Sequence, residues 1–274
     1  MVEPGTNNVL ASVVVPTHNA SKTLEACLRS VVSQTESRIE ILVVDAYSSD
    51  GTESIARKYG RVITLDSGMT EARYQGALQA RGCFVLNLDA DQALAPTSIA
   101  SALAQNTEMA ILEERGRGKG IVALLSQSEK TSLQRWWNPS ADPLSYPVLP
   151  RFYKRELLVK ALQSIPPNIR GIRPCPYAED TIIYLAARQS SSSVGFVRDA
   201  ITHYEEESLW GYLRKWSRYG RAAQLYRGGK YEFLVKERSL KRLARASDPS
   251  TVVALLLRAI PFAMGYYLGP ASPT

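Results

Sequence analysis

The stretch Cys83-Phe84-Val85-Leu86-Asn87-Leu88-Asp89-Ala90-Asp91 places two carboxylates directly after a run of apolar side chains. An apolar run of this length is typical of a buried strand. Ligands of open α/β sheets bind at the carboxyl ends of such strands. Two neighbouring carboxylates repel each other unless a cation neutralises them, and oxygen ligands suit Mg²⁺ or Mn²⁺. The stretch therefore predicts a metal-binding turn at the edge of a sheet.

Upstream of this turn, strand-like and helix-like segments alternate. Short apolar runs predict strands at 12–15, 39–44 and 61–65, and apolar residues at helical spacing predict helices at about 24–32 and 70–80. Alternation of this kind is typical of an α/β fold, in which a mostly parallel central sheet is flanked by helices. The first 110 residues are therefore expected to build such a sheet.

Downstream of residue 110 the alternation is weaker. The sequence predicts a flexible basic turn at 115–120, a strand at 121–125 and a long ordered loop at 126–150. This loop holds Trp136 and Trp137, which are candidates for contact with an acceptor or for a lid. Helices are expected to return at 178–188 and from Leu209 onward.

Polar residues also follow the first two predicted strands. Pro16, Thr17 and Asn19 come after the first, and Asp45 ends the second. In a parallel sheet these ends lie at the same edge as Asp89. Backbone amides and Thr17 could contact a nucleotide there, although a plain strand-to-helix turn is the alternative. A carboxylate at Asp45 could accept a hydrogen bond from a base N–H or a ribose hydroxyl.

The order of these segments resembles the family 2 glycosyltransferases, which have the GT-A fold. The matching segments are Pro16-Thr17-His18-Asn19, Val44-Asp45 with Ser49-Asp50-Gly51-Thr52, Ala72-Arg73, and Asp89-Ala90-Asp91. The resemblance covers about residues 10–110 well and about 145–220 more loosely. It departs from the family at Ala46, where many members have a second aspartate.

The resemblance implies a role for each matching residue. Asp89 and Asp91 would hold Mg²⁺ or Mn²⁺ against the two phosphates of a nucleotide sugar, and Asp45 would contact the base. Arg73 would lie near the diphosphate or hold the nucleotide loop. The nucleotide-sugar site as a whole would comprise Pro16, Thr17, Asn19, Asp45, Arg73, Asp89 and Ala90.

An acidic pair and a histidine follow downstream. Glu179 and Asp180 stand where the family has its acidic pair, and inverting transfer needs one carboxylate to take the proton of the acceptor hydroxyl. Asp180 is our choice for this base and Glu179 the fallback; the alternative is that both acids only stabilise a helix N-terminus. His203 is a candidate third metal ligand, with a structural or surface role as its alternative.

The carboxyl-terminal region is strongly basic and then apolar. Residues 214–245 contain 11 Lys or Arg against two acids, and residues 252–268 are apolar apart from Arg258. Arg258 and the short length of the run argue against a membrane span. The segment is expected either to lie on an anionic membrane surface or to pack on the domain. Nucleic-acid binding is not expected, because no recognised motif accompanies the basic residues.

The sequence as a whole predicts a glycosyltransferase domain at 1–205 and a helical extension at 206–274. The nucleotide-sugar half would be about 1–110 and the acceptor half about 111–205. The expected partners are a UDP- or GDP-sugar, a sugar or lipid-linked acceptor, and an anionic membrane surface. Three dispersed cysteines and the lack of a visible signal peptide favour a cytoplasmic location, with or without peripheral membrane contact.

Two other functions remain open at this point. A nucleotidyltransferase or sugar-nucleotide pyrophosphorylase also places metal-binding carboxylates beside a nucleotide, but it usually needs a glycine-rich phosphate loop. The segment after the first strand, 16–22, contains no glycine. The other alternative is a non-catalytic module that binds a sugar nucleotide or a membrane surface.

Overall fold

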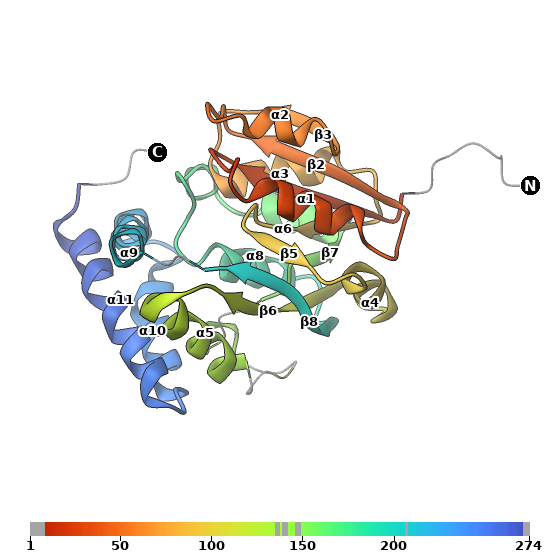
Figure 1. The fold of residues 1–274 in the computed structure, drawn as a ribbon. Coiled ribbons are helices and arrows are strands. Elements are labelled where there is room, and N and C mark those ends of the chain that lie inside the picture. The colour runs from red at the N-terminus through yellow and green to blue at the C-terminus, as the bar shows by residue number, and fades with distance from the viewer. Residues whose placement is uncertain (1–8, 135–137, 139–141, 146–148, 206–207, 271–274) are drawn as a thin grey trace, which may run out of the picture.

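A mixed sheet forms the centre of the molecule (Figure 1). The computed structural model describes residues 9–134, 138, 142–145, 149–205 and 208–270. Within these residues the sheet has eight strands in the order β3-β2-β1-β4-β7-β6-β8-β5. The strands are β1 (Ala11–Thr17), β2 (Ile39–Asp45), β3 (Arg61–Thr64), β4 (Phe84–Asn87), β5 (Gln92–Leu94), β6 (Met109–Arg117), β7 (Phe152–Lys154) and β8 (Val194–Tyr204).

Helices cover both faces of this sheet. Side chains of successive strand residues point to opposite faces, so Val13 and Val15 pack in one apolar core and Val14 in the other. The first core includes α1 (Leu24–Val32), α2 (Thr52–Ala56) and α4 (Ser98–Ala104). The second includes α3 (Met69–Gln79), α6 (Arg155–Gln163) and α8 (Glu179–Arg188). Short helical turns lie at η1 (Pro143–Ser145), α7 (Pro167–Arg170) and η2 (Gln224–Tyr226).

The first four strands are parallel, and their carboxyl ends lie along one edge. Thr17 pairs with Asp45 and Asp45 with Thr64, while the Leu88 amide donates to the Val14 carbonyl. This register brings the ends of β1, β2 and β4 together. The strands and the two longer helices expected upstream of residue 90 are confirmed with small shifts at their ends.

The other half of the sheet is mixed in direction. β7 runs antiparallel to β4 and β6, and β5 runs antiparallel to β8, whereas β6 and β8 are parallel. The β5–β8 pairing places Gln92 opposite His203. A histidine more than 100 residues away in sequence is thereby brought beside the Asp89–Asp91 turn.

The expectation for residues 115–134 is wrong. The expected basic turn is largely the end of β6, and the expected strand at 121–125 lies in a helix, α5 (Gly120–Gln134). The first part of the expected loop at 126–150 belongs to the same helix. Val122 and Ala123 are buried while Ile121 and Leu124 are exposed, because consecutive residues of a surface helix turn toward the core and toward solvent in succession. Trp136 and Trp137 lie outside the described residues.

The carboxyl-terminal extension is helical, as expected. It comprises α9 (Leu209–Ala223), α10 (Glu232–Ala244) and α11 (Pro249–Leu268), which lie together beside α5 (Figure 1). α9 and α11 cross in close contact, because a Cβ atom on Gly220 would overlap the Phe262 carbonyl oxygen and one on Gly265 would overlap that of Ser217. The division of the chain into domains at residue 205 stays a prediction.

Candidate active site

The ends of β1 and β2 form a loop cluster held together by Asp45. This carboxylate is buried, and it accepts hydrogen bonds from Thr17 Oγ1 at 2.8 Å and Ser48 Oγ at 2.6 Å. It also accepts from the Ser48 amide at 2.9 Å. Asn19 accepts from the Ser49 amide at 2.9 Å, and Pro16 is buried within β1. The predicted nucleotide residues therefore lie together, and Asp45 shapes their loop; its contact with a base stays a prediction.

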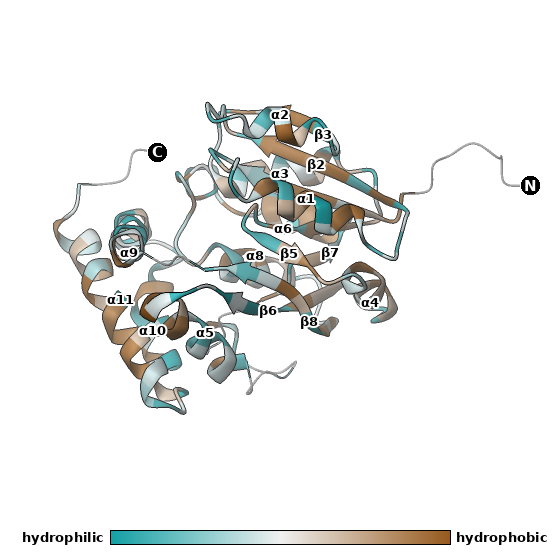
Figure 2. Ribbon diagram, viewed as in Figure 1, coloured by the Kyte–Doolittle hydropathy of each residue, from teal (hydrophilic) through white to brown (hydrophobic). Residues whose placement is uncertain are grey.

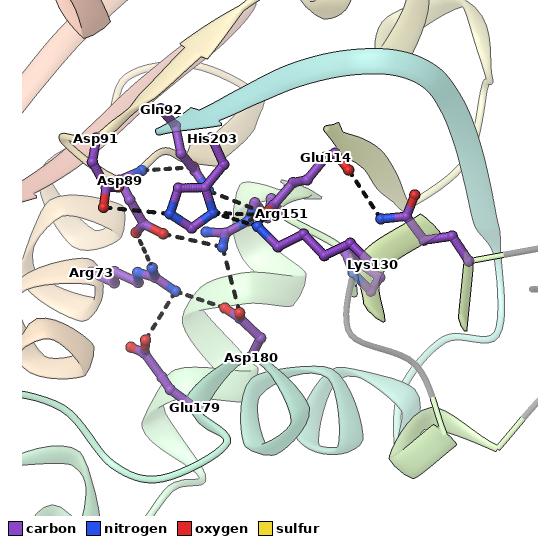
Figure 3. A network of polar contacts seen from close by, with 12 residues as sticks. Arg73, Asp89, Asp91, Gln92, Glu114, Lys130, Arg151, Glu179, Asp180 and His203 are labelled. Atoms are coloured by element: carbon purple, nitrogen blue, oxygen red, sulfur yellow. Dashed lines mark hydrogen bonds and ion pairs between the residues drawn. The ribbon is translucent and has the colours of Figure 1, made fainter. Parts of the chain in front are cut away.

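The two carboxylates of the Asp89–Asp91 turn have different surroundings (Figure 3). Arg73 Nη2 lies 2.6 Å from Asp89 Oδ1, and Arg151 Nη2 lies 3.1 Å from Asp89 Oδ2. Burial acts to raise the pKa of Asp89, but the two guanidinium groups outweigh it and hold the pKa at about 2. The Asp91 side chain is 46% exposed. Asp91 is therefore the carboxylate open to an incoming ligand.

One ring nitrogen of His203 lies near Asp91, and the other lies near the largely buried side chains of Lys130 and Glu114. Nε2 lies 3.4 Å from Asp91 Oδ2, while Nδ1 lies 2.7 Å from Lys130 Nζ and 3.3 Å from Glu114 Oε2. Burial and Lys130 act to lower the pKa of His203, but hydrogen bonds to Asp91 and Glu114 raise it to about 9. The imidazole is thus held between two acids, with Nε2 facing the open carboxylate.

The expected acidic pair begins α8, directly after Ala178 in the left-handed conformation. Glu179 Oε2 and Asp180 Oδ1 lie 3.2 and 3.0 Å from Arg73 Nη1. The Glu179 side chain is 7% exposed, and that of Asp180 is 32% exposed. Burial, opposed by Arg73 and aided by Asp180, raises the pKa of Glu179 to about 7. Asp180 is therefore the more solvent-exposed member of the pair.

Two buried arginines join the Asp89–Asp91 turn to the acidic pair. Arg73 from α3 contacts Asp89 on one side and the pair on the other. Arg151, which precedes β7, contacts Asp89 and lies 3.5 Å from Asp180 Oδ2. Segments separated by about 100 residues in the sequence therefore meet in one network (Figure 3).

Sequence reasoning missed three members of this network. Glu114 from β6 is buried, and its Oε1 accepts from Arg151 Nε at 2.7 Å. Lys130 from α5 lies between Glu114 and Glu205, at 3.3 and 2.7 Å. The third is Arg151. Each is a charged residue outside the matching motifs, and only its largely buried position in the fold marks it.

A metal ion would find few protein ligands here. Among the described residues, no group of three or more His, Cys, Asp or Glu side chains is placed to hold a metal ion. Asp91 and His203 supply two donor atoms, Oδ2 and Nε2, which lie 3.4 Å apart. Mg²⁺ in nucleotide sites is usually held by one or two carboxylates together with substrate phosphates and water. The donor set therefore fits an ion that binds together with a diphosphate.

Known proteins share the amino-terminal part of this chain. A family model described as glycosyl transferase family 2 matches residues 12–112. This region belongs to glycosyl transferase family 2. Glycosyltransferase AglE of Haloferax volcanii is 37% identical over 90 residues, which cover 29% of this chain and 30% of AglE. Cholesterol galactosyltransferase of Borreliella burgdorferi is 30% identical over 95 residues, which cover 32% of this chain and 26% of that protein. The match thus spans about a third or less of these curated relatives.

Solved structures share the fold over nearly the whole chain. Residues 1–349 of TarS from S. aureus superpose with a TM-score of 0.59 at 19% identity, covering 93% of this chain and 73% of that one. The mannosyltransferase PcManGT of Pyrobaculum calidifontis, in complex with GDP-Man and Mn²⁺, gives 0.56 at 19% identity, covering 94% and 83%. The expected GT-A fold is confirmed.

Proposed function

We propose that this protein is a glycosyltransferase that moves a sugar from a nucleotide diphosphate sugar to an acceptor hydroxyl or phosphate, with inversion at the anomeric carbon. The observation that carries the proposal is the network in which Arg73 and Arg151 join Asp89 to Asp180. A donor site and an acid–base pair are the two parts that such a reaction needs. The family 2 match and a TarS structure in complex with UDP-GlcNAc, with a TM-score of 0.56, support it.

A divalent ion is part of this proposal. Asp91 and His203 Nε2 would hold it, and Asp89, already engaged by two arginines, would act through water. When bound, Mg²⁺ or Mn²⁺ would neutralise charge on the leaving diphosphate. Since a metal-bound Nε2 carries no proton, the ring proton would then lie on Nδ1, where Glu114 Oε2 at 3.3 Å can accept it and Lys130 must withdraw.

Asp180 is proposed as the base that accepts the proton of the acceptor hydroxyl. Its carboxylate is the more exposed of the pair, and two guanidinium groups fix its position. Glu179 is buried behind it, and a pKa of about 7 leaves Glu179 partly protonated near neutral pH. Glu179 is therefore proposed to set the position of Arg73 rather than to contact the acceptor.

The acceptor is proposed to lie at an anionic membrane surface. The basic helices α9 and α10 stand next to the apolar helix α11, and α11 packs on α5, which supplies Lys130 to the site. A lipid-linked or membrane-proximal acceptor would suit this arrangement.

The test begins with a donor screen. Thermal unfolding is followed with UDP-, GDP- and dTDP-sugars in the presence of Mn²⁺, since a ligand that binds only the folded state raises the melting temperature. Transfer or slow hydrolysis of the stabilising donor is then compared in wild type, Asp180→Asn and Asp66→Asn, the last an exposed carboxylate outside the network.

We expect Asp180→Asn to lower the rate at least about 100-fold, as loss of a general base typically does, while donor binding and the Asp66→Asn rate stay near wild type. Wild-type rates for Asp180→Asn would show that another group is the base. A product that retains the donor's anomeric configuration would refute the single-displacement mechanism.

A further inference from the structure

The outward side of α11 carries an unbroken row of exposed apolar side chains. The first five are spaced three or four residues apart along the helix, and the last two are adjacent. All six are between 51 and 80% exposed, and we call them the α11 outer face: Val253, Leu256, Ile260, Met264, Tyr267 and Leu268. Figure 2 shows hydrophobic colouring along this helix at the outside of the molecule. A contiguous apolar surface of this kind marks a site of association.

The inward side of α11 is fixed to the rest of the protein. Arg258 donates to both oxygens of Glu129 on α5, at 2.7 and 2.6 Å, and both side chains are buried. At the start of the helix, Asp248 accepts from Ser128 Oγ at 3.1 Å. Near its end, Gly265 packs directly on the Ser217 carbonyl of α9.

These contacts decide how α11 can meet a membrane. The helix has the length and composition to cross a membrane, and 39% of its apolar stretch is buried inside the structure. Crossing a bilayer would pull Arg258 away from Glu129 and place its charge in hydrocarbon, which is strongly unfavourable, while Glu129 on α5 would lose this buried partner. A helix with one anchored face and one exposed apolar face can instead lie in the plane of the interface.

Charge complementarity identifies the partner. Residues 209–274 contain 12 Lys or Arg against three acids, while residues 1–208 contain 21 against 23. The net positive charge of the chain therefore comes entirely from residues 209–274, which include the α11 outer face. Exposed basic side chains include Arg214 and Arg218 on α9 and Lys236 on α10. This favours an anionic surface over a second copy of the chain, which would bring two strongly positive extensions together.

We propose that the α11 outer face docks in the interface of an anionic lipid bilayer, with α11 lying parallel to the membrane and the active site facing acceptors at that surface. Exposed Trp210 on α9 and Tyr267 on α11 add aromatic rings of the kind that settle at headgroup level. The docking does not depend on sugar transfer; only the statement about acceptors rests on the proposed function.

Two packed helices, α11 and α5, lie between this surface and the candidate active site. On α5, Glu129 is held by α11, and the next residue, Lys130, contacts His203 and Glu114. Since a helix with its side chains is about 10 Å wide, docking of α11 would keep the site within roughly 20 Å of the lipid headgroups.

Sedimentation with vesicles tests the proposal. The full chain is mixed with vesicles of phosphatidylcholine alone or with about one-third phosphatidylglycerol, at low and high salt. The double variant Leu256→Glu/Ile260→Glu alters the α11 outer face. The control Val32→Glu/Leu78→Glu adds the same charge at exposed apolar positions of α1 and α3. Melting temperatures and nucleotide-induced stabilisation are measured for all three proteins, so that loss of fold or of donor binding is recognised separately.

We expect wild type and control to bind the anionic vesicles at low salt and to be released by high salt, and the α11 variant to partition at least about tenfold less. Equal vesicle binding by the α11 variant, or no binding by wild type, would overturn the proposal. So would resistance to extraction at alkaline pH, which marks a spanning helix. A dimer in solution that the α11 variant dissociates would assign the face to a second copy instead.

Discussion

Replacing Glu179 with glutamine should change how the stability of this protein depends on pH. The Glu179 carboxyl is buried at the start of α8, beside Arg73 and Asp180. Burial, only partly offset by Arg73, raises its pKa from 4.5 to about 7. A carboxyl that holds its proton more tightly in the folded state stabilises that state at low pH.

The expected magnitude follows from this difference in pKa. The stabilising contribution is fully present below about pH 4.5 and is lost as the pH rises through about 7. A gap between 4.5 and about 7 corresponds to roughly 3 kcal/mol in the free energy of unfolding. Glutamine has the same shape and does not titrate. Relative to wild type, Glu179→Gln should therefore become more stable by about that amount between pH 4.5 and pH 8.

Urea unfolding of wild type and Glu179→Gln across this pH range measures the difference directly. Glu179→Asp is the matched control, because it keeps a titrating carboxyl at the same place and should retain most of the wild-type pH dependence. A stability difference between wild type and Glu179→Gln that stays constant from pH 4.5 to pH 8 would contradict a raised pKa of Glu179 in the folded protein, since Glu179 would then titrate alike in the folded and unfolded chains.

Three further substitutions test the packing of the site and the extension. Arg73→Met should lower the free energy of unfolding by about 3–5 kcal/mol, because it removes the guanidinium beside buried Glu179 and one of the two beside Asp89 and Asp180; a loss below 1 kcal/mol in urea unfolding would contradict this. Asp248→Ala should cost about 1–2 kcal/mol through loss of the α11 N-cap bond to the Thr251 amide, and Asp248→Asn much less, as measured by the same method. Gly265→Leu should lower the melting temperature by forcing α9 and α11 apart, whereas Gly229→Leu, where a Cβ atom would meet only the Tyr226 carbonyl oxygen at 3.5 Å, is the comparison for a glycine without a steric conflict.

The first half of the fold was predictable because local patterns coincide there with the final structure. The apolar runs at 12–15 and 39–44 are strands that lie in the middle of a sheet covered on both faces, where an unbroken apolar run is required. The run at 121–125 has the same composition, but it is the start of α5. Periodicity cannot separate a short buried strand from a helix segment, and here tertiary contacts decided.

The candidate site was predictable where motifs stand at strand ends. Asp89 and Asp91 follow β4 directly, and Asp180 begins a helix, so their positions could be expected from the sequence. Arg151, Glu114 and Lys130 could not, because their role arises from long-range pairing of β6, β7 and α5 around one buried charge network. Such long-range contacts cannot be predicted from the spacing of residues in the sequence.

Metal-assisted binding of a nucleotide diphosphate is tested most directly by the effect of Mn²⁺ on nucleotide binding by wild type and Asp91→Asn. Asp91 is the exposed carboxylate beside His203 Nε2, and we propose it as the main protein ligand of a metal ion that bridges to the diphosphate. Isothermal titration with the best nucleotide diphosphate, with and without Mn²⁺, gives the increment in affinity that the ion supplies. We expect wild type to bind the nucleotide at least about tenfold more tightly with Mn²⁺, a gain of about 1.4 kcal/mol, and Asp91→Asn to lose this increment. An equal increment in Asp91→Asn, or no binding of any nucleotide diphosphate by the folded wild type, would contradict it.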